Sequence, residues 1–177
     1  MPPPLILTAR FAAADQARFD ALRRRHFPPQ LNHIGAHLTM FHHLPGEDEA
    51  EVDAALRRLA ATQPPCIAAV TGLRSLGRGV AFHLDCPPLA RLRGAVARTF
   101  HDRLTAQDRQ GWRPHGTIQN KVAPAEAAAL LAAMQAVFSP FDVAVTGLCL
   151  WHYRGGPWTP AGEYPFDGAE PAPAACQ

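Results

Sequence analysis

The sequence predicts an α+β fold in which antiparallel or mixed β-sheets line a central cleft and helices pack outside them. Three observations predict it: strand-like and helical segments alternate, several strands are close enough to form hairpins, and the pentapeptide AVTGL occurs twice, at residues 69–73 and 144–148. The 177 residues, 47% hydrophobic and 18% charged, are enough for one domain with a substantial core.

The N-terminal part of the chain predicts a strand followed by a helix. LILTARF, residues 5–11, has the apolar character of a strand. Residues 13–26 are expected to be helical because Phe19, Leu22 and His26 recur at the spacing of one helix face. The prolines of FPPQLNHIG then end the helix.

The middle of the chain predicts two helices separated by a hairpin. GEDEAEVDAALRRLAATQPP, residues 46–65, begins with acidic residues, carries arginine near its end and is closed by two prolines, as is typical of a helix. Residues 66–73 and 79–86 are strand-like and are joined by RSLGR. Two prolines open a third helix, expected over residues 87–104.

The C-terminal part repeats this alternation. A strand-like segment at residues 115–122 precedes an alanine-rich helix at 124–138, a strand at 141–153 and a returning strand that ends near Phe166. From Asp167 onward the chain is rich in proline and alanine, so we expect residues 167–177 to be a flexible tail.

The order of motifs indicates an internal duplication. In each half a His-x-Thr segment is followed by a helix, by AVTGL and by an Arg-Gly turn. We therefore expect residues 1–166 to form a single bilobal domain of two related halves, about 30–86 and 108–166, with 5–26 and 87–105 completing the lobes. Halves related by a pseudo-twofold axis would bring equivalent strands together.

Bulk properties restrict the partners. A net charge of +2 is much lower than the strongly positive charge of proteins that bind nucleic acids non-specifically. The four cysteines form no CxxC pair, so we expect reduced, mostly buried thiols. The N-terminus has neither the basic start nor the apolar length of a signal peptide or membrane span. We expect a cytoplasmic protein without membrane or DNA partners, with a monomer as the default.

The two His-x-Thr segments carry the candidate chemistry. Side chains at positions i and i+2 of a strand share a face, so His37 lies beside Thr39 and His115 beside Thr117. One neutral histidine can take a proton from water while a second, protonated one gives a proton to a departing oxygen. The threonine hydroxyls can donate to the non-bridging oxygens of a phosphodiester. The near-symmetry leaves open which histidine is acid and which is base.

Paired His-x-Thr motifs on the two halves of a duplicated chain resemble the 2H phosphoesterase superfamily, which includes bacterial 2′-5′ RNA ligase-like proteins and cyclic phosphodiesterases. The resemblance covers residues 5–166 and implies a bilobal fold, catalytic His37 and His115, phosphate-binding Thr39 and Thr117, and neither metal nor other cofactor. It implies a phosphodiesterase that converts 2′,3′-cyclic phosphate on nucleotides or RNA ends to a 2′-phosphate. The alternatives are 2′-5′ RNA ligation and a non-catalytic RNA- or nucleotide-binding module. Many RNA-processing members carry an arginine after the second motif, where this chain reads QNKV.

Further candidates follow from strand alternation. Gln119 and Lys121 share the face of His115 and are candidates for binding phosphate, and Phe41 shares the face of His37. Phe41 and Tyr153 are candidates for stacking on a base. His42 is expected to face away from His37, so the histidines near the first motif do not predict a metal site. The triplet Arg23–Arg25 is interpreted as compensation of a helix dipole.

Overall fold

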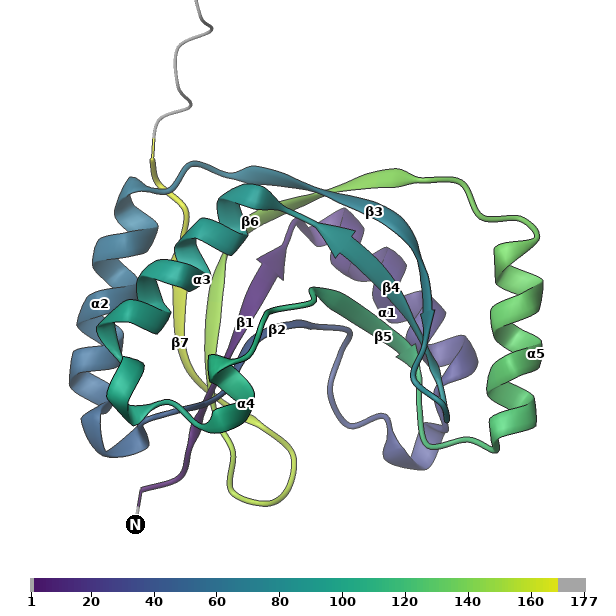
Figure 1. Ribbon diagram of the computed structural model, residues 1–177, viewed down its shortest axis with the longest axis horizontal. Coiled ribbons are helices and arrows are strands. Elements are labelled where there is room, and N and C mark those ends of the chain that lie inside the picture. The colour runs from purple at the N-terminus through teal and green to yellow at the C-terminus, as the bar shows by residue number, and fades with distance from the viewer. Residues whose placement is uncertain (1, 169–177) are drawn as a thin grey trace, which may run out of the picture.

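The computed structural model describes residues 2–168, and its strands form one antiparallel sheet (Figure 1). The strand order is β1-β2-β5-β4-β3-β6-β7, and β1 also pairs with β6, so six strands close into a ring that β7 extends. The strands are β1 (Leu5–Phe11), β2 (Leu38–Leu44), β3 (Cys66–Ser75), β4 (Val80–Asp85), β5 (His115–Gln119), β6 (Phe141–His152) and β7 (Thr159–Pro165). The predicted α+β class is confirmed. The predicted tail beyond residue 168 lies outside the described residues.

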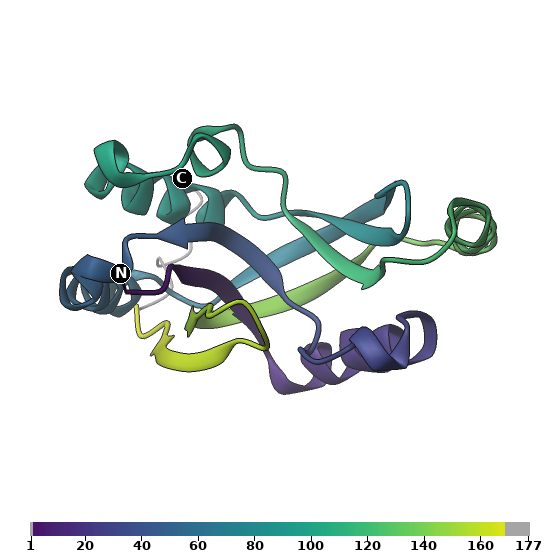
Figure 2. The same ribbon diagram turned by 90° about the horizontal axis from the view of Figure 1, so that it is seen from below.

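Helices cover the sheet at both ends (Figures 1 and 2). They are α1 (Ala13–His26), α2 (Glu49–Thr62), α3 (Pro87–Thr99), α4 (Ala106–Arg109) and α5 (Pro124–Gln135). The third helix is shorter than predicted, and a separate turn at His101–Arg103 places the Arg103 guanidinium 2.6 Å from Asp48 and 2.7 Å from Glu51. The four residues of α4 were not predicted, because one helical turn is too short to show a periodicity.

The buried core combines residues of the strands of the ring with residues of the helices that cover them. On α2 the buried residues Val52, Ala55, Leu56 and Ala60 recur at the spacing of one helix face, which turns the apolar side of the helix toward the sheet. Consecutive residues of β1 are buried on both of its faces, which explains its continuous apolar run. Burial of these side chains is the main stabilising term for the ring.

Strand registers support the inferred duplication. Ala68 pairs with its sequence equivalent Val143 at the centre of the β3–β6 contact, and Leu38 pairs with its equivalent Gly116 where β2 meets β5. Self-pairing of equivalent residues is the mark of a twofold axis. The registers make β1 equivalent to β4, so we infer repeat units running from β1 to β3 and from β4 to β6, with β7 outside the repeat. These units begin at β1 and β4 rather than at the two His-x-Thr segments.

Each His-x-Thr strand carries a β-bulge one residue after its threonine. The register of β1 with β2 moves from Thr8↔Thr39 to Leu7↔Phe41, and Met40 is the extra residue. The register of β4 with β5 moves from Ala81↔Thr117 to Val80↔Gln119 in the same way. A bulge reverses the alternation of faces beyond it, so Phe41 and Gln119 point opposite to the simple prediction.

The cysteines and helices of the described part bear on two further expectations. Cys66, Cys86 and Cys149 are free thiols, with Cys86 buried, and the Sγ atoms of Cys66 and Cys86 lie 3.6 Å apart. Cys176 lies outside the described residues. Within residues 2–168, every helix is too short or too polar to cross a lipid bilayer.

Candidate active site

The two His-x-Thr motifs meet at the narrow contact between β2 and β5. The two strands are joined by a single antiparallel pair, Leu38↔Gly116. This register places His37 across from Thr117 and His115 across from Thr39, because antiparallel neighbours run in opposite directions. Each histidine is therefore combined with the threonine of the other motif.

Both motif histidines are oriented by the same backbone contact. The Nδ1 atom of His37 lies 2.9 Å from the carbonyl oxygen of Gly35, and that of His115 lies 2.9 Å from the carbonyl oxygen of Arg113. A carbonyl only accepts, so Nδ1 carries the proton in each ring. Each neutral ring then has an unprotonated Nε2 atom that can accept a proton.

The surroundings lower the pKa of both histidines. Burial is the main cause for His37, whose ring packs 4.7 Å from that of Trp158, and nearby Arg23 adds to it; the pKa falls to about 4. Burial also lowers the pKa of His115, with Arg74 as an additional positive charge. The hydrogen bonds to the carbonyls act in the opposite direction but do not outweigh burial. Both rings are therefore neutral at pH 7 in the free protein.

Two hollows open beside the β2–β5 contact. The larger, of about 630 Å³, is lined by Thr39 and His115, and the smaller, of about 510 Å³, is lined by His37 and Thr117. All four motif side chains thus border solvent-accessible space at one place in the fold. A phosphoryl group at the contact would be within reach of both motifs.

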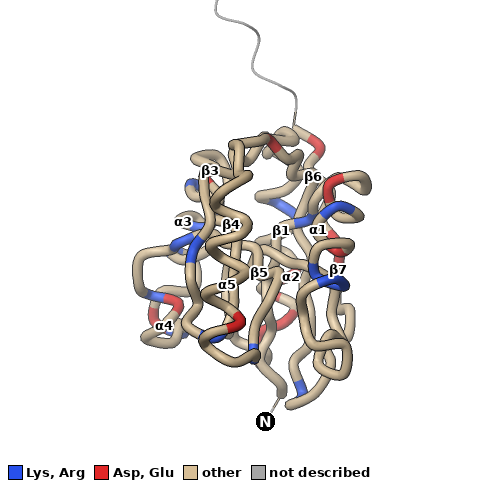
Figure 3. Tube along the Cα trace, turned by 90° about the vertical axis from the view of Figure 1, so that its right-hand side faces the viewer, with Lys and Arg blue, Asp and Glu red and all other residues tan. Residues whose placement is uncertain are grey.

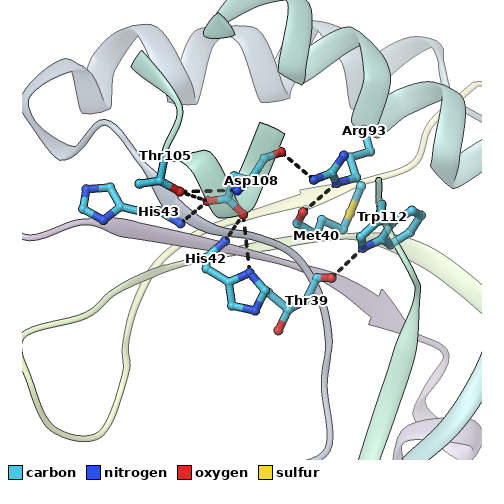
Figure 4. Close-up of polar contacts among 8 residues, drawn as sticks. All are labelled: Thr39, Met40, His42, His43, Arg93, Thr105, Asp108 and Trp112. Carbon is cyan, nitrogen blue, oxygen red and sulfur yellow. Dashed lines mark hydrogen bonds and ion pairs between the residues drawn. The ribbon is translucent and has the colours of Figure 1, made fainter. Parts of the chain in front are cut away.

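A buried carboxylate organises the wall of the larger hollow (Figure 4). Asp108 of α4 accepts hydrogen bonds from the backbone N–H groups of His42 at 2.9 Å and His43 at 2.8 Å. Burial by itself raises the pKa of Asp108, but hydrogen bonds from His42 and from these N–H groups outweigh it, so the net shift is downward. Asp108 therefore ties α4 to β2 as a carboxylate.

Side chains from α3 and from the segment before β5 complete this wall. Arg93 donates to the carbonyl oxygens of Met40 at 2.9 Å and Asp108 at 2.8 Å, and its guanidinium lies 4.6 Å above the ring of Phe41. Trp112 donates from Nε1 to the carbonyl oxygen of Thr39 at 2.9 Å. These contacts hold the backbone at the C-terminal end of the first motif in place.

The smaller hollow has a more aromatic wall. Trp158 and Tyr153, from the β6–β7 connection, line it together with Lys121. Lys121, two residues after the end of β5, has φ 62°, a left-handed turn conformation. Arg23 also lines this hollow and donates to the carbonyl oxygen of Thr117 at 3.0 Å.

The structure brings six of the eight candidate residues to the hollows. His37, His115, Thr39, Thr117, Lys121 and Tyr153 line them. Phe41 is 0% exposed and has no free ring face for a base, so its proposed stacking role is corrected. Gln119 is 3% exposed and its Oε1 atom has no hydrogen-bond partner, and it lines neither hollow. Both residues follow the bulges described above, which turn them away from the cleft.

The same bulges bring in residues that alternation assigned to the other face. His42 lines the larger hollow and Asn120 lines the smaller one. Arg23 is also corrected, because it is only 6% exposed and bonds to β5 rather than serving the helix dipole alone. Arg74, Arg93 and Asp108 were missed, since no local motif marks an isolated charge on a distant element. Among the described residues no group of three His, Cys, Asp or Glu side chains is arranged to hold a metal ion.

Comparisons with known proteins bear on the family and on the fold. A family model described as the 2′-5′ RNA ligase superfamily matches residues 11–157. The structure is similar to that of TT0787 of Thermus thermophilus, with TM-score 0.69 and 16% identity over 94% of this chain and 100% of that one. It is also similar to E. coli LigT complexed with 3′-AMP, with TM-score 0.61 and 19% identity over 94% and 99% of the two chains. A search of curated proteins gives no match.

Proposed function

The chain belongs to the 2′-5′ RNA ligase superfamily, and from this membership we propose that it is a metal-independent phosphodiesterase acting on 2′,3′-cyclic phosphates of nucleotides or RNA ends. One observation carries the proposal. Two histidines with unprotonated Nε2 atoms each lie opposite the threonine of the other motif. The cyclic phosphate requires a ribose 2′-hydroxyl, so the proposed substrates derive from RNA rather than DNA.

The proposed reaction is an in-line displacement at phosphorus. One histidine Nε2 accepts a proton from water as the water oxygen forms its bond to phosphorus. The P–O3′ bond breaks, the other histidine gives its proton to the departing O3′, and the 2′-phosphate remains. The atoms balance as one water added for each ring opened, and the two rings exchange protonation states before the next turnover.

The threonines and the lysine are assigned to the charge of the phosphoryl group. Thr39 and Thr117 border the hollows on the two sides of the β2–β5 contact, where their hydroxyls can donate to non-bridging oxygens. Lys121 can add a positive charge from the rim of the smaller hollow. Tyr153, which is 41% exposed, offers a ring face to the base.

The direct test is hydrolysis of the four nucleoside 2′,3′-cyclic monophosphates with EDTA present, with the products separated by chromatography. We expect nucleoside 2′-phosphates only, at a rate that EDTA does not change. Formation of 3′-phosphate would contradict the assigned bond cleavage. Activity that EDTA abolishes would contradict the absence of a metal from the mechanism.

The pH dependence follows from the lowered histidine pKa values. Catalysis needs one neutral and one protonated ring, and the free protein has both rings neutral at pH 7. We therefore expect kcat/KM to rise as pH falls from 7, to peak between about pH 4 and the ordinary histidine value of 6.5, and to fall again below about 4. A pH–rate profile of kcat/KM checks this, and a maximum above pH 7 would contradict it.

The same geometry can run in the ligating direction. If the 5′-hydroxyl of an RNA end took the place of water, the same two proton transfers, with P–O3′ again the bond that breaks, would form a 2′-5′ linkage, in keeping with the name of the family. Incubating RNA ends that carry 2′,3′-cyclic phosphate with 5′-hydroxyl ends separates the two activities. We propose hydrolysis as the main reaction because water at high concentration competes with any second RNA end.

A further inference from the structure

The larger hollow is more spacious and more basic than one phosphoryl group requires. Its volume is about 630 Å³. Arg74 of β3, Arg93 of α3 and Arg113 before β5 line it, against a single carboxylate, that of Asp108. Along the chain as a whole, basic and acidic residues are interspersed (Figure 3).

Two of these charged groups already form hydrogen bonds within the protein. Both oxygens of Asp108 accept hydrogen bonds from the backbone of β2, and the carboxylate also lies 3.4 Å from the Nδ1 atom of His42. Arg93 donates to two backbone carbonyl oxygens. These two groups are therefore held in place as parts of the wall.

Arg74 and Arg113 remain available. Among the described residues, neither side chain has a hydrogen-bond or ion-pair partner. Arg74 is close enough to His115 to lower its pKa. Both arginines thus line the hollow next to the catalytic centre, and their guanidinium donors are unused.

The duplication does not account for these two arginines. The repeat relation that matches Ala69 with Ala144 places Cys149 at the equivalent of Arg74. The relation that matches His37 with His115 places Gly35 at the equivalent of Arg113. The Arg74–Arg113 pair is therefore particular to the larger hollow, whereas the smaller hollow has Arg23, Lys121 and its aromatic wall instead.

We propose that Arg74 and Arg113 form a subsite for a second phosphate group of the substrate, separate from the phosphate that reacts. The inference rests on the proposed phosphodiester site and specifies its substrate class. Paired guanidinium groups bind phosphate through charge-assisted hydrogen bonds, which are stronger than neutral ones. The half-exposed ring of His42 lies on the same wall, with its Nδ1 atom 3.4 Å from the Asp108 carboxylate. The preferred ligand then carries two phosphates, either a nucleotide with a terminal phosphate or an RNA end with its next phosphodiester.

Binding of product-like ligands tests this without relying on turnover. Calorimetry would compare adenosine 2′-monophosphate, adenosine 2′,5′-bisphosphate and a diadenosine dinucleotide ending in a 2′-phosphate. We expect at least one of the two doubly phosphorylated ligands to bind about 10- to 100-fold more tightly than the monophosphate. A gain for the bisphosphate identifies a terminal phosphate as the source, and a gain for the dinucleotide alone identifies the chain phosphate.

Variants assign the gain to the two arginines. Arg74→Gln with Arg113→Gln should abolish the gain and leave the monophosphate affinity within about twofold. The matched control is Arg109→Gln, which removes one positive charge from α4 outside the hollow and should keep the gain. Equal affinity of all three ligands, or a gain that survives the double substitution, would overturn the subsite.

The outcomes separate this inference from the proposed reaction. Tight binding that depends on Arg74 and Arg113, without turnover of any cyclic phosphate, would retain the subsite and contradict the hydrolase. Turnover of cyclic mononucleotides with no preference for a second phosphate would retain the hydrolase and contradict the subsite.

Discussion

Replacing His37 or His115 with alanine is expected to lower kcat for hydrolysis of 2′,3′-cyclic phosphates by about 10²–10⁴-fold each. Either change removes one of the two proton transfers. In each ring Nδ1 is bonded to a backbone carbonyl, so Nε2 is the atom that exchanges a proton with the substrate or water. KM should change less, since the threonines and the basic side chains remain. Initial rates on a cyclic mononucleotide at pH 5.5 and at pH 7 measure both constants.

His43→Ala is the matched control. His43 is adjacent to His42 on the same strand, its side chain is exposed, and it lines neither hollow. The control should retain wild-type activity, and all three variants should keep the thermal midpoint of the parent within a few degrees. The two-histidine mechanism would fail if either catalytic variant retained more than about a tenth of the wild-type kcat.

The double variant His37→Ala/His115→Ala adds information that the single variants lack. Residues that act as one unit give non-additive losses, so the double variant should be little slower than the slower single variant. A multiplicative loss would instead mean that each ring acts on an independent step. The comparison therefore tests whether the two motifs serve one phosphoryl group.

The fold and the centre of the site could be predicted because they depend on patterns that repeat. Alternation placed a histidine and a threonine on one face of each strand, and that holds up to Thr39 and Thr117. The repeated AVTGL segments indicated halves that pack around an axis, and β3 and β6, which contain them, are neighbours in the sheet. Such patterns can be read directly from short stretches of the sequence.

The parts that could not be predicted depend on one-residue shifts of strand register or on contacts between elements that are distant in the sequence. The bulges at Met40 and Ile118 reverse the faces of Phe41 and Gln119, and neither bulge has a glycine or another local signal. Arg74 and Asp108 reach the site from a strand end and a one-turn helix, respectively. Their role depends on which elements the closed ring brings together.

Asp108→Ala is expected to have the largest effect on stability, lowering the free energy of unfolding by about 2–4 kcal/mol. Asp108 is 2% exposed, and removal of its carboxylate leaves the N–H groups of His42 and His43 without their partner. Urea unfolding at pH 7, followed by fluorescence, measures the loss. Asp102→Ala is the control, because the Asp102 side chain is 100% exposed and its removal should change stability by at most about 0.5 kcal/mol.

The pH dependence of this loss distinguishes the carboxylate from a packing effect. The pKa of Asp108 in the folded protein lies below the ordinary value of 3.8. The native state therefore stabilises the ionised carboxylate, relative to its protonated form, more than the unfolded state does. The stability that it contributes is fully present above the unfolded pKa and is lost as pH falls through the lower folded pKa. The difference in unfolding free energy between wild type and Asp108→Ala should therefore be constant from pH 7 to about 5 and shrink below 3.8. A difference that stayed constant down to pH 2 would assign the effect to the volume of the side chain instead of its charge.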